Sequence, residues 1–168
     1  MSRKRLAKIG CIAAAACLGL AAFGLCGLMV VETVLFRPRP SELPDSRSDY
    51  RAYDLDSPRF DWFHREYDAA LEADYSWIHK PEAVGLRLAG YPNPDGVRPD
   101  IVRVYWPRPD KAIVVVIATG LMDDSVEAMK VRVDLVQRGH LWEVEWAGGQ
   151  WRCWPGRGGS IWGSRLCV

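Results

Sequence analysis

The last 27 residues of this 168-residue chain hold the side chains best suited to binding a ligand. They include five of the eight tryptophans and three arginines, and no acid follows Glu145. Tryptophan faces stack on sugars, bases or cations, arginines donate paired hydrogen bonds to anions, and glycines such as those in 155–160 let backbone N–H groups approach an anion. The predicted ligand-binding residues are Arg152, Trp154, Arg157, Trp162 and Arg165.

A structural role explains the same residues. Small domains use tryptophans as core side chains, and glycines satisfy tight turns. The two interpretations are compatible if some of the tryptophans point inwards while Trp154 and Trp162 face solvent. The partner of such a surface would be a protein, a glycan or an anionic ligand.

Two cysteines flank the glycine-rich loop. Cys153 and Cys167 are the only cysteines outside the apolar N-terminal segment, and a lone pair in an exported domain favours a disulfide. Closing a loop of this length stabilises a fold by about 3 kcal/mol in the chain-entropy model. A zinc site is the alternative, but with His140 the two cysteines fall short of the four ligands that a structural zinc ion needs.

Asp123 and Asp124 follow an apolar segment and are the best-placed acids for catalysis. Paired carboxylates can act as general acid and base or bind a cation, and Glu143 could join them. Adjacent residues point in divergent directions, however, and Asp-Asp-Ser is common in turns. These residues define the alternative function, an envelope hydrolase that uses Asp123, Asp124 or Glu143.

Other catalytic and cofactor motifs do not occur in the sequence. It contains no phosphate-binding loop, no dinucleotide fingerprint and no His-Glu-x-x-His pair. The three histidines, His64, His79 and His140, share no metal-ligand spacing, so we expect ordinary surface histidines, no metal and no cofactor. The sequence therefore favours a non-catalytic binding module over an enzyme.

Residues 9–31 are uncharged and rich in Ala, Leu, Gly and Val. As a helix this segment would be about 34 Å long, enough to cross a hydrocarbon core of about 30 Å. Four basic residues precede it, which predicts a cytoplasmic N-terminus and a periplasmic or extracellular C-terminal part. We therefore expect residues 1–36 to be a retained single-pass anchor in the cell membrane, with secretion after signal cleavage as the alternative.

The remaining chain, residues 37–168, holds 18 Lys and Arg against 20 Asp and Glu, a net charge of −2. A nearly neutral domain gives no reason to expect nucleic acid as a partner. Residues 37–56 begin with Arg-Pro-Arg-Pro and remain polar, which predicts a tether between the membrane and a domain over 57–168.

Within this domain, apolar residues recur at helical spacing from 57 to about 75 after a Ser-Pro start, which predicts an amphipathic helix. Residues 81–89 fit either a short helix or a strand. Strands with short turns between them are predicted at 101–106, 112–118, 129–135 and 142–146.

In the third of these strands the polar side, Arg132 and Asp134 included, is expected to face water. In the fourth, Trp142, Val144 and Trp146 are expected to share one face. The predicted fold class is α+β, with a transmembrane helix followed by an amphipathic helix packed on an antiparallel β-meander. This order resembles cystatin-like and NTF2-like rolls in architecture, although no motif is shared.

Overall fold

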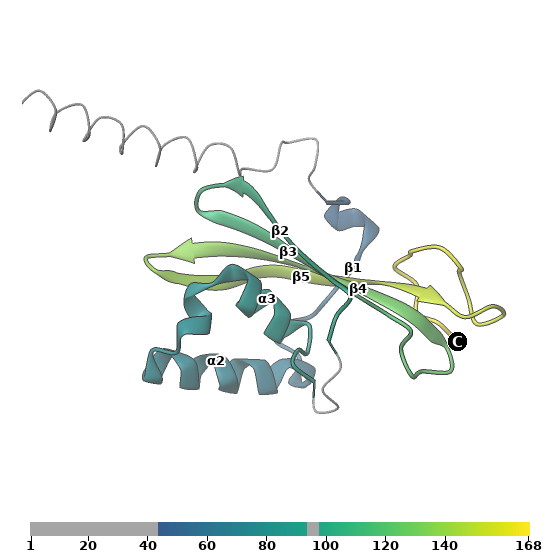
Figure 1. Cartoon of the computed structure of the whole chain (residues 1–168), viewed down its shortest axis with the longest axis horizontal. Coiled ribbons are helices and arrows are strands. Elements are labelled where there is room, and N and C mark those ends of the chain that lie inside the picture. The colour runs from purple at the N-terminus through teal and green to yellow at the C-terminus, as the bar shows by residue number, and fades with distance from the viewer. Residues whose placement is uncertain (1–43, 94–97) are drawn as a thin grey trace, which may run out of the picture. The chain divides into compact units, whose positions relative to one another are not determined.

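A five-stranded antiparallel sheet is the centre of the computed structural model, which describes residues 44–93 and 98–168 (Figure 1). The strands lie in the order β1-β5-β4-β3-β2. Their bounds are β1 Arg51–Ala52, β2 Ile101–Arg108, β3 Lys111–Thr119, β4 Val126–Arg138 and β5 Leu141–Cys153. The helices are α2 Asp61–Ala73 and α3 Pro81–Leu88, and short 3-10 turns are η2 Arg47–Asp49, η3 Pro58–Phe60 and η4 Ser76–His79. The predicted α+β class is confirmed.

The predicted membrane segment, residues 9–31, lies outside the described residues. Among the helices of 44–93 and 98–168, none has both the length and the apolar character needed to cross a membrane.

Both helices pack on one face of the sheet (Figure 1). The predicted amphipathic helix is confirmed as η3 followed by α2, whose apolar side is buried. The ambiguous segment 81–89 is mostly helical, because Val84 and Leu88 lie one turn apart and both reach the core. Gly85 brings α3 close to β3, since a Cβ at this position would lie 2.6 Å from atoms of the Val114 side chain.

The other face of the sheet is partly covered by the segment before β1. Arg47, in η2, donates a hydrogen bond to Asp134 at 2.6 Å, and Tyr50 is only 5% exposed. The chain then pairs with β5 as strand β1. Residues 44–52, which we expected to belong to a tether, are therefore part of the folded domain, which begins earlier than residue 57.

The expectation that the polar side of β4 faces water is wrong at two positions. Arg132 and Asp134 are 7% and 6% exposed, and hydrogen bonds of 2.6 and 3.0 Å join their side chains. A buried pair of opposite charges is tolerated when the partners neutralise each other and satisfy their hydrogen bonds. The alternation along β4 is as predicted, but the segment before β1 returns to cover its polar side.

A bulge in β5 moves Trp146 to this second face. Val144 and Trp146 pair with consecutive residues of β4, so Glu145 is an extra residue between them. As a result Val144 faces the core with Trp142, whereas Trp146 packs edge-on against Tyr50 at a centroid distance of 6.2 Å. The prediction that Trp146 shares the face of Trp142 is wrong for this reason.

Candidate binding site

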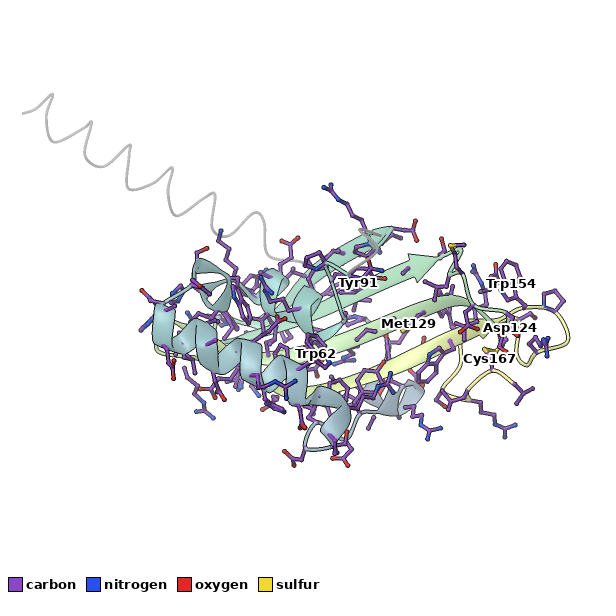
Figure 2. The ribbon with its side chains drawn as sticks, turned by 90° about the horizontal axis from the view of Figure 1, so that it is seen from below. Trp62, Tyr91, Asp124, Met129, Trp154 and Cys167 are labelled. Atoms are coloured by element: carbon purple, nitrogen blue, oxygen red, sulfur yellow. A yellow bond between two sulfur atoms is a disulfide. The ribbon has the colours of Figure 1, made fainter. Side chains whose placement is uncertain are left out.

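The C-terminal loop, residues 154–168, and the connection between β3 and β4 form one end of the sheet. Figure 2 shows Asp124, Trp154 and Cys167 together there. The predicted disulfide is confirmed, because the Sγ atoms of Cys153 and Cys167 lie 2.04 Å apart. The backbone of Trp151 also exchanges two hydrogen bonds with the returning loop. The loop is therefore fastened to the end of β5 at two places.

Trp154 joins the two segments of this end. Its indole Nε1 donates to the carbonyl oxygen of Asp123 at 2.9 Å, and its backbone N–H donates to the carbonyl oxygen of Ser125 at 3.0 Å. The Ser125 hydroxyl in turn donates to the carbonyl oxygen of Val168 at 3.1 Å. The Trp154 residue remains 38% exposed, so it is fixed in position while part of it faces solvent.

Two of the predicted ligand-binding residues are already occupied by contacts within the domain. Arg152 donates two hydrogen bonds to Glu127, at 2.8 and 3.1 Å. The cationic groups of Arg152 and Lys130 lie 5.4 and 4.8 Å from the centroid of the Trp162 ring. Contacts of this kind use the ring surface on which a ligand would stack. A ligand at Trp162 would therefore have to displace them.

Arg157 and Arg165 differ from Arg152. Both are exposed, and neither guanidinium is paired with an acid of the described residues. They are therefore the two cationic side chains of the C-terminal loop that remain free to meet a partner.

The acids considered for hydrolysis do not share a cleft. The backbone N–H groups of Val126 and Ser125 each donate to Asp123 Oδ1 at 2.8 Å, and these hydrogen bonds lower the pKa of Asp123. Asp123 thus holds the turn as a carboxylate, and Asp124 is exposed beside it. Glu143 pairs with β4 ten residues beyond Val126. That separation is about 33 Å along a strand, far from the 5–9.5 Å typical of paired glycosidase carboxylates.

Glu143 instead lines a pocket of about 250 Å³ between α2 and β5, together with His64 and Tyr67. The Tyr67 hydroxyl donates to the carbonyl oxygen of Trp142 at 2.9 Å. Burial and the negative charge of Glu143 raise the pKa of Tyr67, which keeps it a neutral phenol. His64 Nε2 lies 3.0 Å from the carbonyl oxygen of Leu55. Asp56 also lines the pocket, and no hydrogen bond joins any two of its four ionisable side chains, so they do not form a coupled acid–base pair.

A cluster that the sequence analysis missed lies at the opposite end of the sheet, beside the turn between β4 and β5. Asp74, His79 and His140 each offer one ligand atom there, and these atoms all lie within 4.8 Å of one another. Sequence spacing could not indicate this cluster, because His79 and His140 are 61 positions apart. The sequence analysis treated His79 and His140 as ordinary surface histidines, and the structure adds that their ring centroids lie 5.1 Å apart.

Comparison of the chain with models of protein families, with curated proteins and with solved structures finds no match. Among the described residues, the C-terminal end of the sheet presents the most exposed apolar side chains together with unpaired cations.

Proposed function

We propose that this chain is a membrane-anchored envelope protein whose extracytoplasmic domain is a non-catalytic binding module. The uncharged residues 9–31 behind four bases support a single-pass anchor with a cytoplasmic N-terminus. The disulfide supports an oxidising compartment, because structural disulfides persist outside the cytosol.

A roll resembling the cystatin-like and NTF2-like ones is part of this proposal. The order of a helix followed by an antiparallel meander supports it, as does the packing of α2 and α3 on one sheet face.

The observation that carries the functional proposal is the apolar surface at the C-terminal end of the sheet. Eight large apolar side chains are exposed among the described residues, and five of them belong to this end. They are Met122, Trp154, Ile161, Leu166 and Val168. Exposed apolar clusters on small domains mark interaction surfaces. Because Arg157 and Arg165 add two unpaired cations, the partner we expect is a protein segment that presents apolar side chains and carboxylates.

A protein partner fits this surface better than a glycan does. Sugars stack on open aromatic faces, but the Trp162 ring already lies beneath two cationic side chains. The exposed groups apart from Trp154 are aliphatic or thioether side chains, which pack well against another protein.

Site-specific photocrosslinking in intact cells tests this proposal. A photoreactive phenylalanine replaces Ile161, which is 79% exposed in the loop, and in a matched control it replaces Leu71, which is 41% exposed on α2. We expect a discrete protein adduct at position 161 and none at position 71. Reversing two charges with Arg157→Glu and Arg165→Glu should remove the adduct. Adducts with lipid alone, or equal adducts at both positions, would refute the proposed surface.

A further inference from the structure

We propose that Asp74, His79 and His140 bind a divalent transition-metal ion of the Zn²⁺ type. Asp74 directly follows the last residue of α2, His79 ends η4, and His140 lies in the turn between β4 and β5. Their three ligand atoms already lie within 4.8 Å of one another. Ligands of one tetrahedral ion, each about 2.0–2.2 Å from the metal, are about 3.3 Å apart. Small side-chain rotations are therefore enough to close the site.

The hydrogen bonding of His79 indicates which nitrogen would bind the metal. Its Nδ1 lies 3.1 Å from the carbonyl oxygen of His140, so an N–H at Nδ1 has an acceptor. Metal-binding histidines commonly donate their second ring N–H to a backbone carbonyl in this way, which fixes the tautomer. Nε2 then directs a lone pair towards Asp74 Oδ1, which is 2.9 Å away. A separation of 2.9 Å fits a proton shared by the two atoms. A metal ion would replace this proton and move the two atoms to about 3.3 Å from each other.

The second imidazole favours a metal ion over a proton, and the helix end favours a cation of either kind. The rings of His79 and His140 are tilted by 32° with centroids 5.1 Å apart, so both can turn a nitrogen to the same point. The C-terminus of α2 carries the negative end of the helix dipole, which favours a cation beside Asp74. Asp74 itself holds the left-handed backbone conformation with φ of 50°. The left-handed conformation is less favourable in free energy for an aspartate than for a glycine, but a glycine would supply no carboxylate at this position.

The ligand set indicates the class of metal. Two imidazoles and one carboxylate suit Zn²⁺, Ni²⁺, Cu²⁺ or Fe²⁺, whereas Mg²⁺ and Ca²⁺ prefer sites made of oxygen atoms. Asp74 and His140 are exposed, so a fourth coordination position would be open to water. This inference concerns the end of the sheet opposite to the C-terminal loop, and it does not depend on the proposed binding function.

The test uses the full chain, purified in detergent and stripped of metal with a chelator. Zn²⁺ binding is followed by calorimetry and Co²⁺ binding by visible absorption. We expect one ion per chain and the absorption typical of four-coordinate Co²⁺. Asp74→Asn and His140→Ala should each weaken binding at least about tenfold, because loss of an outer partner alone already costs that much. The matched control is His64→Gln, which removes the histidine outside the cluster and should leave binding unchanged.

Circular dichroism of each variant confirms that the fold is intact. The proposal is overturned if no ion binds, or if Asp74→Asn and His140→Ala bind as the wild type does. It is also overturned if nitrogen NMR in the presence of Zn²⁺ finds His79 protonated at both ring nitrogens. His79 would then be an imidazolium paired with Asp74, and the cluster would be an ion pair only.

Discussion

Replacing Asp134 by Leu should strongly destabilise the domain. Asp134 accepts hydrogen bonds from Arg132 at 2.6 and 3.0 Å and from Arg47 at 2.6 Å, and its side chain is 8% exposed. The substitution leaves the buried Arg132 cation without its carboxylate. Removing one partner of a buried ion pair costs about 3–5 kcal/mol, most of it the desolvation of the charge that stays behind.

A cost of this size is easily measured. For a domain of this length it corresponds to a fall in melting temperature of roughly 12–20 °C. Thermal unfolding of the purified protein, followed by far-ultraviolet circular dichroism, provides the assay. The control is Glu72→Ala, because Glu72 is an exposed acid on α2 with no partner among the described residues. The control should shift the free energy of unfolding by no more than about 0.5 kcal/mol.

A triple variant distinguishes destabilisation by the unpaired charge from destabilisation by the changed side-chain shape. In Arg47→Met, Arg132→Met, Asp134→Leu all three charges are replaced by apolar side chains of similar size. Glu145, the exposed second partner of Arg47, keeps its hydrogen bond from Lys111 in this variant. Exchanging buried ion pairs or triads for apolar side chains is often neutral or stabilising, so the triple variant should recover most of the stability lost by the single substitution. If the triple variant is as unstable as Asp134→Leu, or if the single variant melts like the control, the unpaired-charge argument is refuted.

Three further predictions concern packing, the disulfide and pH. Gly85→Ala should lower the free energy of unfolding by about 1–2 kcal/mol, because crowding of the new methyl group against Val114 outweighs the gain in helix propensity. A rise in melting temperature would contradict the close packing of α3 on β3. Cys167→Ser should cost about 3 kcal/mol in urea unfolding, and an unchanged midpoint would show that the loop closure does not restrict the unfolded chain. The pKa of Glu145 is lowered chiefly by its hydrogen bond from Lys111. On acidification the unfolded state therefore takes up this proton at a higher pH than the folded state does. The contribution of Glu145 to stability is present above the ordinary pKa of 4.5 and is lost as the pH falls through the lowered pKa. Glu145→Gln should therefore lose less stability than the wild type on acidification below about pH 4.5, and parallel pH–melting curves for the two proteins would contradict this.

Local patterns were sufficient to predict most of the elements. The helical spacing after Ser57 and the period of two from Ile101 onwards both match the structure, because each reflects burial against one neighbouring layer. Residues 81–89 could not be decided, since Val84 and Leu88 fit a helix face and, with Leu86 between them, also fit one side of a strand. The bulge at Glu145 has no local marker, because it depends on how β5 pairs with β4.

The candidate sites were harder to predict from the sequence than the helices and strands, because they depend on contacts between distant parts of the chain. The disulfide was predictable from the number of cysteines and their position. The burial of Asp134 was not, because its partner Arg47 lies 87 positions away. For the same reason Trp162 could not be known to lie beneath Lys130, and His79 could not be known to lie beside His140. The sequence showed which side chains are chemically able to bind a ligand. Only the tertiary contacts showed which of these side chains already bind other residues of the domain.

The pairing of β1 with β5 affects the order in which the domain can be completed. Arg51 lies opposite Gly149, so the first strand of the domain to be synthesised has its hydrogen-bonding partner almost a hundred residues later. At a synthesis rate of about 5–20 residues per second, that partner emerges about 5–20 s afterwards. For most of this interval Arg47 lacks its partner Asp134 on β4, and until β5 emerges Tyr50 lacks Trp146 and β1 lacks its pairing strand. A nascent chain halted before β5 would therefore expose this N-terminal segment to proteases and chaperones, and release of the last residues would protect it.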